Sequence, residues 1–159
     1  MRFIADCMLG TLAKWLLILG HDVVYLRRVE DGVLVRIAVQ EKRTILTRDR
    51  RLAHRRAARD HILIQSQDLQ EQIRQVLKER RLRIRGEHLF RRCIRCNQLT
   101  EVVPRETVRD RVPIYVYRTQ SRFTRCPRCS RIYWRATHVS RMLETLQKRL
   151  RRPVAPASP

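Results

Sequence analysis

Apolar runs recur four times in the first half of the chain, separated by segments whose apolar residues have helical spacing. Runs of consecutive aliphatic residues are typical of parallel strands that are buried on both faces. The predicted strands cover residues 3–6, 22–26, 44–48 and 61–65. The predicted helices cover residues 9–19, 32–42, 50–59 and 68–80. This alternation predicts an α/β fold in which a small parallel sheet carries helices on both faces, giving three layers.

Local signals mark the ends of several of these elements. Gly20 follows the first predicted helix, at a position where a glycine commonly ends a helix. Asp31 and Asp68 precede the second and fourth predicted helices. Both are good N-cap candidates, because an aspartate oxygen accepts hydrogen bonds from the free N–H groups of the first helical turn.

The alternation of strand and helix stops after residue 80, where a basic connector begins. We place a domain boundary near residues 86–90. The predicted parallel-sheet domain then covers residues 1–86, and a smaller unit covers residues 87–150.

The smaller unit has a weaker secondary-structure pattern. The segment VPIYVYR (112–118) is predicted to form a short strand, and residues 137–150 are predicted to form a final helix. Residues 151–159 are rich in Pro and Ala and are expected to be a disordered tail.

Four of the five cysteines form two C-x-x-C pairs, in RCIRCNQL and RCPRCSRIYW. They are Cys93 with Cys96 and Cys126 with Cys129, and 29 residues separate the two pairs. Two such pairs are typical of a tetrahedral Zn²⁺ site closed by four thiolates, which is structural; a redox pair is the less favoured alternative. The sequence therefore predicts a zinc ribbon in the smaller unit. The fifth cysteine, Cys7, is expected to be a small buried residue.

The net charge points to a polyanionic partner. The chain has 36 Lys and Arg against 15 Asp and Glu, a net charge of +21. Only four of the basic residues are lysines, so 32 are arginines, whose guanidinium groups bind phosphate through two parallel hydrogen bonds. This composition favours nucleic acid over a membrane surface. An arginine-rich codon bias with solvated charged faces is the alternative, and it explains arginine over lysine better than it explains the net charge.

The sequence has no feature of a secreted or membrane protein. Its first residues lead directly into a predicted strand, without the apolar segment and cleavage site of a signal peptide. The longest apolar patch, around WLLIL (15–19), is far short of the ~20 residues of a membrane span. Paired cysteines that bind metal are expected where thiols stay reduced. We therefore expect a cytoplasmic protein with no membrane partner.

Three aspartates follow the first three predicted strands. Asp6 ends the first strand, Asp31 lies five residues after the second, and Asp49 follows the third in LTRDRRL. The carboxyl ends of parallel strands meet at one edge of a sheet, and ligands bind there at the point where the strand order reverses. Converging carboxylates repel one another unless a divalent cation lies between them. The pattern predicts a Mg²⁺ or Mn²⁺ site that activates water against a phosphodiester.

Helix capping is an alternative for each of these aspartates, because each also precedes a helix. Glu30, beside Asp31, is a candidate that could assist the site. Asp22 begins a strand at the opposite edge of the sheet and is expected to be structural, whereas Asp68 is a cap or an outer ligand. No Gly-rich loop follows the first strand, which argues against a P-loop or dinucleotide-binding protein.

The segment FIADCMLGTLAKWLLILGHDVVYL, the acidic pair that follows it, and TILTRDRRL resemble one known family. This is the PIN-like ribonuclease domain found at the C-terminal end of the Mut-seven exonucleases, which is followed by a zinc ribbon. The resemblance covers roughly residues 1 to 145. It implies a metal-dependent ribonuclease whose acidic residues stand at Asp6, Asp31 and Asp49. PIN nucleases usually present four acidic residues, of which three are matched here.

Basic and aromatic residues around these motifs are candidate RNA contacts. Guanidinium and aromatic groups together are typical of a single-strand platform, although aromatic residues in so small a unit also form its core. The candidate phosphate contacts are Lys14, Arg48, Arg50, Arg51, Arg92, Arg95, Arg128 and His138. The aromatic residues near the cysteines are Tyr115, Tyr117, Phe123, Tyr133 and Trp134. We favour a core position for Trp134, and His138 is either a phosphate contact or a helix cap.

The sequence therefore favours a ribonuclease that uses Mg²⁺ or Mn²⁺, with a structural Zn²⁺ ribbon and an arginine-rich surface that hold RNA. The alternative is a non-catalytic RNA- or ribosome-binding module with the same fold. A toxin of the toxin–antitoxin type is a weaker option, because those proteins usually lack a ribbon. The sequence distinguishes neither tRNA, rRNA and mRNA as targets nor the oligomeric state.

Overall fold

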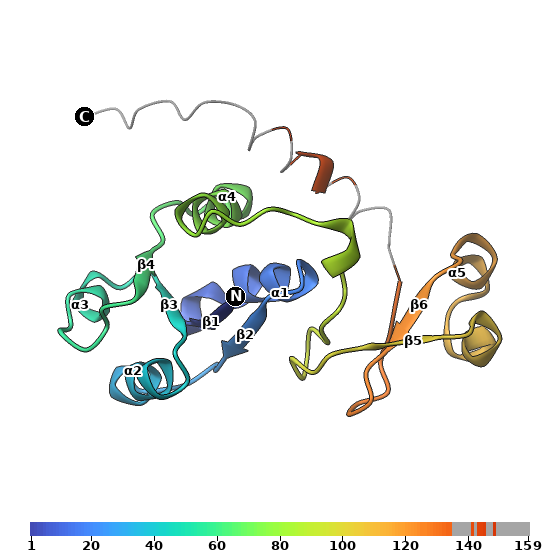
Figure 1. The fold of residues 1–159 in the computed structure, drawn as a ribbon, viewed down its shortest axis with the longest axis horizontal. Coiled ribbons are helices and arrows are strands. Elements are labelled where there is room, and N and C mark those ends of the chain that lie inside the picture. Colours follow the sequence, from blue (N-terminus) through green and yellow to red (C-terminus); the bar gives the residue numbers. More distant parts are fainter. Residues whose placement is uncertain (135–140, 142, 146–147, 149–159) are drawn as a thin grey trace.

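A parallel sheet of four strands forms the first part of the protein. The structure, a computed structural model, describes residues 1–134, 141, 143–145 and 148. The strands lie in the order β2-β1-β3-β4 (Figure 1). They are β1 (Arg2–Ala5), β2 (Asp22–Tyr25), β3 (Thr44–Thr47) and β4 (His61–Leu63). The helices are η1 (Cys7–Leu9), α1 (Gly10–Ile18), α2 (Asp31–Gln40), α3 (Arg50–Ala53) and α4 (Leu69–Glu79). The expected α/β fold is confirmed.

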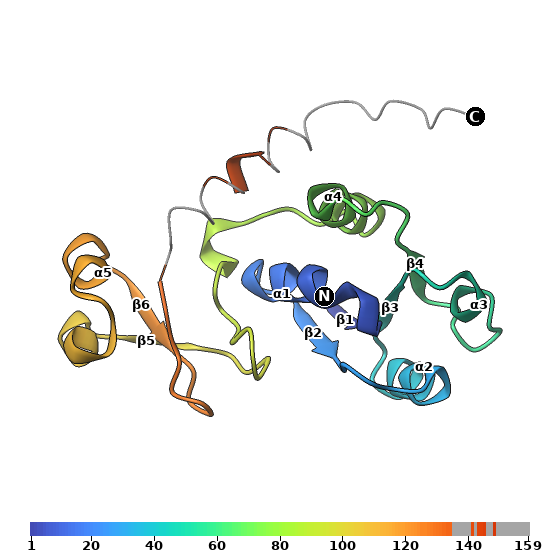
Figure 2. The same cartoon turned by 180° about the vertical axis from the view of Figure 1, so that it is seen from behind.

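Alternate residues of the central strands point to opposite faces of the sheet. Phe3 and Leu46 pack with α1 and α4 in one buried cluster. Ile4 and Ile45, their neighbours in sequence, pack with α2 and α3 in a second cluster on the other face. Figures 1 and 2 show α1 and α4 together on one side of the sheet and α2 on the other. The consecutive apolar residues of the central strands, Phe3-Ile4-Ala5 in β1 and Ile45-Leu46 in β3, are therefore explained by the cover on both faces.

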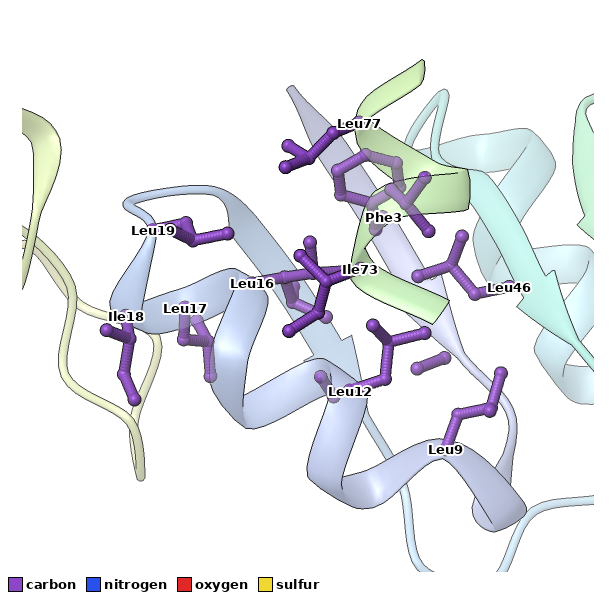
Figure 3. Close-up of a cluster of buried hydrophobic side chains, with 14 of the residues drawn as sticks. Phe3, Leu9, Leu12, Leu16, Leu17, Ile18, Leu19, Leu46, Ile73 and Leu77 are labelled. Atoms are coloured by element: carbon purple, nitrogen blue, oxygen red, sulfur yellow. The ribbon is translucent and has the colours of Figure 1, made fainter. Parts of the chain in front are cut away.

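The first cluster is the larger of the two. In Figure 3, Leu12 and Leu16 of α1 point toward Ile73 of α4, with Phe3 and Leu46 of the sheet beside them. All five side chains are fully buried. Complete burial of an aliphatic or phenyl side chain stabilises a fold by about 1.5–3 kcal/mol, so this cluster fixes α1 and α4 against the sheet.

A three-stranded antiparallel sheet forms the second part of the protein, in the order β5-β6-β7. Its strands are β5 (Glu101–Val103), β6 (Phe123–Arg125) and β7 (Ile132–Tyr133). The other elements in this part of the chain are η2 (Gly86–His88), η3 (Arg105–Arg111) and α5 (Ile114–Thr119). Figures 1 and 2 show this sheet beside β2, on the side away from β4 and α3.

The predicted final helix is described only in part. Residues 141, 143–145 and 148 are helical, and Leu143 is buried in the first cluster. The predicted tail, 151–159, lies outside the described residues, as does His138. No helix in the described part of the chain combines the length and the apolar character that a membrane span needs.

Three expectations about local structure are wrong. The segment 112–118 is not a strand, because Ile114–Thr119 form helix α5 and the carbonyl of Pro113 accepts the N–H of Tyr117 at 2.9 Å. Ile114 and Tyr115 are 60% and 72% exposed, so no sheet holds this apolar run in a strand. Helix α3 ends at Ala53, because the four residues after it are exposed and bury nothing that would hold further turns. Cys7 is exposed rather than buried.

Asp22 joins the two sheets. Its Oδ1 accepts hydrogen bonds from Arg43 Nη1 at 2.5 Å and from Asn97 Nδ2 at 2.8 Å. Asn97 Oδ1 in turn accepts the backbone N–H of Val23 in β2 at 3.3 Å. Partial burial acts to raise the pKa of Asp22, but the hydrogen bonds from Asn97 and Arg43 hold it below its usual range. Asp22 therefore has the structural role that its position in the sequence suggests.

Gly20 allows the connector to approach the end of α1. Its φ of +89° is in the left-handed region, and a Cβ there would lie 2.3 Å from the carbonyl oxygen of His88. We expect Gly20→Ala to lower the free energy of unfolding by about 2–3 kcal/mol, through backbone strain and steric overlap. Urea unfolding measures this loss. Gly86→Ala is the control, because a Cβ at Gly86 meets nothing within 4 Å, and an equal loss in both variants would contradict the prediction.

His21 makes stability depend on pH. Burial, with the nearby charges of the N-terminal amine and His88, lowers the pKa of His21 from 6.5 to about 4. Above pH 6.5 the imidazole is neutral in both the folded and the unfolded state. Between pH 6.5 and 4 the unfolded chain binds a proton that the folded protein does not, so stability falls as pH falls.

The loss over this interval is about 2–3 kcal/mol, and it levels off below the folded pKa. Urea unfolding at a series of pH values measures it. We expect His21→Gln to flatten this part of the profile, and an unchanged slope in that variant would contradict the assignment.

Candidate metal centre and active site

Four thiols in the second sheet are positioned to bind one metal ion. The sulfur atoms of Cys93, Cys96, Cys126 and Cys129 all lie within 4.8 Å of one another. Cys93 and Cys126 are fully buried, and the sulfur atoms of Cys93 and Cys129 are 3.6 Å apart. Four converging thiols with no open position fit a tetrahedral structural Zn²⁺. The predicted cysteine cluster is thus confirmed, and it supports a zinc site.

The two C-x-x-C loops share one backbone geometry. The N–H groups of Asn97 and Ser130 each donate to the carbonyl of the first cysteine of their loop at 2.9 Å. Both residues have a positive φ, 59° for Asn97 and 56° for Ser130, as the tight turn after the second cysteine requires. This repeated turn brings both thiols of each loop to the same side.

The surroundings of Cys93 favour its thiolate. Burial acts to raise the pKa of Cys93, but hydrogen bonds from the Tyr133 hydroxyl and from the N–H groups of Arg95 and Cys96 lower it to about 6. The Tyr133 oxygen lies 3.0 Å from Cys93 Sγ. Burial raises the pKa of Tyr133 itself, so its hydroxyl stays protonated and donates. Since the thiolate is the form that binds metal, this neighbour prepares the sulfur as a ligand.

The order of the strands places Asp6 and Asp49 at the same edge of the sheet, and we refer to this place as the crevice. The sequence order reverses between β1 and β3, which are neighbours in the sheet, and this is where ligands bind in open α/β sheets. Asp6 directly follows β1, and Asp49 lies two residues after β3. Asp6 is 9% exposed, so its carboxylate is held within the edge of the sheet.

Thr47 connects the Asp6 carboxylate to the backbone of Asp49. Its hydroxyl, fully buried at the end of β3, donates to Asp6 Oδ2 at 2.8 Å and accepts the N–H of Asp49 at 2.9 Å. The sequence reasoning missed this residue. The available signal was a hydroxyl at the last position of a buried strand. An apolar side chain would fill that position equally well, so a hydroxyl there indicates a hydrogen-bonding role.

Both aspartates also cap helices, as the alternative interpretation expects. Asp6 Oδ1 accepts the N–H of Met8 at 3.4 Å, and Asp49 Oδ1 accepts the N–H of Arg51 at 2.7 Å. The helices that they cap, η1 and α3, are three and four residues long. Each cap uses one oxygen of the carboxylate, so the capping contacts and a metal role are compatible.

Asp31 is placed differently from the other two aspartates. It is the first residue of α2, and Glu30 occupies the N-cap position without a side-chain cap bond, so the expected cap at Asp31 is wrong. Asp31 Oδ2 lies 3.1 Å from Arg55 Nη2, and both side chains are more than a third exposed. Within the described residues, the three aspartates do not form a group as close as the four cysteines do. The predicted cap at Asp68 is confirmed, since its side chain accepts the N–H of Glu71 at 2.9 Å.

Cys7 stands next to Asp6 but is a poor nucleophile. Its thiol is exposed at the start of η1, and its carbonyl accepts the Tyr25 hydroxyl at 3.0 Å. A hydrogen bond with Asp6 raises the pKa of Cys7, and burial and the Asp6 charge add to the shift. The protonated thiol is therefore the favoured form, and thiolate chemistry at this crevice is disfavoured.

The candidate phosphate contacts fall into two groups. Lys14 on α1 is exposed, as are Arg50 and Arg51 at the start of α3, and Arg48 beside them is half-buried. Near the cysteines, Arg95 and Arg128 are exposed.

Arg92 has a structural contact. Its Nη1 donates to the carbonyl of Asn97 at 2.8 Å, and its Nη2 lies 3.8 Å from Asp22 Oδ2. Its guanidinium is therefore partly engaged in joining the two sheets.

Most of the aromatic residues near the cysteines have structural contacts. Phe123 and Tyr133 are buried, and Arg105 stacks on the Tyr117 ring at 4.5 Å. Tyr115 is exposed on α5. Trp134 is half-buried, and it lines a cavity of about 630 Å³ between the connector and the ribbon.

A comparison with protein-family models gives one match, the Mut7-C RNAse domain, over residues 1–146. The chain belongs to this family. The match extends through both sheets and the four cysteines, which confirms the resemblance seen in the sequence. Neither the curated proteins nor the solved structures include a match. Membership in the Mut7-C RNase family gives the protein an RNA-related, nuclease-type function.

We expect one zinc ion per chain, measured by elemental analysis of the purified protein. Cys126→Ser is expected to lose the ion and unfold the ribbon while the parallel sheet stays largely folded, because a closed four-thiolate site supplies folding energy.

Tyr133→Phe removes the hydroxyl beside Cys93 and is expected to lower zinc affinity about tenfold or more in a chelator competition. Tyr115→Phe is the control, since that side chain is 72% exposed. Metal-free protein with a folded ribbon would contradict the assignment.

Proposed function

We propose that this Mut7-C protein is a metal-dependent ribonuclease that hydrolyses RNA phosphodiesters at the crevice between β1 and β3. The observation that carries the proposal is the Asp6–Thr47–Asp49 chain of hydrogen bonds at the reversal of the strand order. Family membership supports a nuclease-type function. The crevice supplies the acidic groups that such chemistry requires.

The donor set fits Mg²⁺ or Mn²⁺. Both ions take oxygen ligands, and Mg²⁺ usually binds one or two carboxylates and keeps several waters. Asp6 and Asp49 would be these carboxylates. Asp31 would contact the ion through a bound water, and its ion pair with Arg55 would then break. An exposed ion pair contributes only about 0–1 kcal/mol, so breaking it costs little free energy.

The protein's own residues would position the reactants. When bound, the ion lowers the pKa of a water and balances the charge that develops on the phosphate. The Thr47 hydroxyl holds the Asp6 carboxylate in one orientation, and the helix-cap bond from the Arg51 N–H holds the Asp49 carboxylate. Arg50 and Arg51, in the first turn of α3 beside Asp49, would draw the RNA phosphates toward the crevice.

The ribbon would hold the RNA strand. Arg95 and Arg128 each lie between the two cysteines of a C-x-x-C loop and are exposed, so the metal-bound turns present guanidinium groups to solvent. The net charge of +21 favours RNA as the partner of the whole surface. Zn²⁺ is structural in this proposal.

A non-catalytic RNA-binding module is the second candidate. The observation that favours it is that Asp6 and Asp49 both accept helix-cap hydrogen bonds, which gives these carboxylates a structural reason to be present. The two candidate functions predict different effects of removing either negative charge: RNA cleavage is lost for a nuclease, whereas a binding module has no cleavage to lose.

Asp6→Asn and Asp49→Asn separate the two candidates. Asparagine caps a helix about as well as aspartate, so Asp49→Asn is expected to change stability by only a few tenths of a kcal/mol. Asp6→Asn also weakens the buried hydrogen bond from Thr47 and is expected to lower stability by about 1–2 kcal/mol. For the nuclease, cleavage of unstructured RNA in Mn²⁺ is expected to fall at least about 100-fold, because metal stabilisation of the transition state is worth several kcal/mol. RNA affinity is expected to hold or rise slightly, since a negative charge is removed.

Asp110→Asn is the matched control, because Asp110 is an exposed carboxylate on η3, away from the crevice. Melting temperature checks the folding of each variant. Unchanged cleavage in both crevice variants would refute the metal site. Wild-type protein that binds RNA in Mn²⁺ without cutting it would favour the binding module.

A further inference from the structure

A strongly basic cleft lies at the amino ends of β1 and β2. It has a volume of about 780 Å³ and is lined by the connector, by the end of α1 and by Leu99. Its arginines are Arg81, Arg83, Arg85, Arg91 and Arg92, and its histidines are His21 and His88. No Asp or Glu is among the described residues that line it, although the carboxylate of neighbouring Glu87 lies 3.7 Å from His88 Nε2. We refer to this site as the basic cleft.

We propose that the basic cleft binds phosphates of the same RNA strand that enters the crevice. The inference rests on the proposed function, because that function makes RNA the substrate. The shared chemistry is a phosphodiester or polyphosphate anion, which several guanidinium groups bind together. The cleft thus acts as an anchor for the substrate at a distance from the reacting bond.

Three of the arginines are free to bind an anion. Within the described residues, no ion pair engages Arg81, Arg83 or Arg91. Arg85 lies 3.7 Å from Glu87, but both side chains are more than 60% exposed, so this pair is weak. Unpaired guanidinium groups in one cleft repel one another, and a bound anion reduces this repulsion.

The connector is fixed against the first sheet, so the cleft is formed before any ligand arrives. The N–H of Phe90 donates to the carbonyl of Ile18 at 2.9 Å, and the N–H of Leu82 donates to that of Leu77 at 2.7 Å. Gly20 allows His88 to approach the end of α1 without a steric clash. Preorganised binding groups lose less entropy on binding than mobile ones.

The basic cleft is separate from the crevice. Met1 lines the cleft, whereas Asp6 lies at the other end of β1, five residues away. A strand rises about 3.3 Å per residue, which separates the two sites by roughly 16 Å. The two sites therefore hold different parts of one RNA strand.

The state of His21 agrees with a positive potential in the cleft. Burial lowers the pKa of this residue, and so do the nearby positive charges of the N-terminal amine and His88. A bound anion would favour the protonated imidazole. The NMR signals of His21 and His88 are therefore local reporters of occupancy.

The first test compares two double variants of the full-length protein that remove equal charge. Arg83→Gln/Arg85→Gln changes the cleft, and Arg36→Gln/Arg109→Gln changes exposed arginines elsewhere. The affinity for a labelled unstructured RNA is measured at several salt concentrations without added Mg²⁺ or Mn²⁺. We expect the cleft variant to bind roughly tenfold more weakly, and its log–log salt slope to be shallower by about 1.4. In Mn²⁺, its KM for RNA is expected to rise while kcat holds.

The second test adds inorganic tripolyphosphate, and separately RNA, to the wild-type protein and follows the histidine signals by NMR. Shifts of His21 and His88 with both ligands, lost in the cleft variant, support the proposal. Equal weakening in the two double variants, or no shift with RNA, would overturn it. A shift with tripolyphosphate alone would also overturn it and would assign the cleft to a free phosphate compound. RNA that shifts both histidines but is never cut would refute the proposed ribonuclease while the anchor stands.

Discussion

The Asp22 carboxylate is the interaction on which the arrangement of the two sheets depends. It lies at the start of edge strand β2 and is shared by Arg43 from the first sheet and Asn97 from a cysteine loop. Arg43 is buried, and its Nη1 also donates to the carbonyl of Phe3 at 3.3 Å. A buried guanidinium needs such a partner, because leaving it unpaired costs several kcal/mol. The sheet edge and the ribbon therefore form one polar network.

In the proposed function, the side chains at the crevice have both a structural and a chemical role. Asp6 and Asp49 cap helices with one oxygen, and Thr47 orients Asp6. A charge held in this way loses little entropy when a cation arrives. Acidic residues are few in this basic chain. Asp6 and Asp49 lie where the strand order reverses, which is where ligands bind in open α/β sheets.

The four strands of the parallel sheet could be predicted from the sequence to within about two residues, because apolar runs buried on both faces leave little choice of structure. The short strands β5, β6 and β7 were not predicted. The four cysteines could be predicted as one cluster because their spacing is itself the geometric signal. The helix within segment 112–118 could not be predicted, because the β-branched and aromatic composition of the segment favours a strand. Pro113 and solvent exposure override that preference. The hydroxyl at the end of a buried strand was a local signal for Thr47, but its bonds to Asp6 and Asp49 depend on which segments meet in space. The basic cleft depends on the meeting of distant segments as well, and no local pattern of the sequence indicates it.

The contact between Asn97 and Val23 has a consequence for the behaviour of the chain in solution. β2 is an edge strand, and the Asn97 side chain covers one of its outward N–H groups. Exposed strand edges pair readily with other chains, and natural proteins cover or charge them. Asn97 keeps its position only while its cysteine loop stays folded around the thiols. A metal ion bound by the four thiols would therefore also help to keep β2 from pairing with the same strand of another copy of the chain.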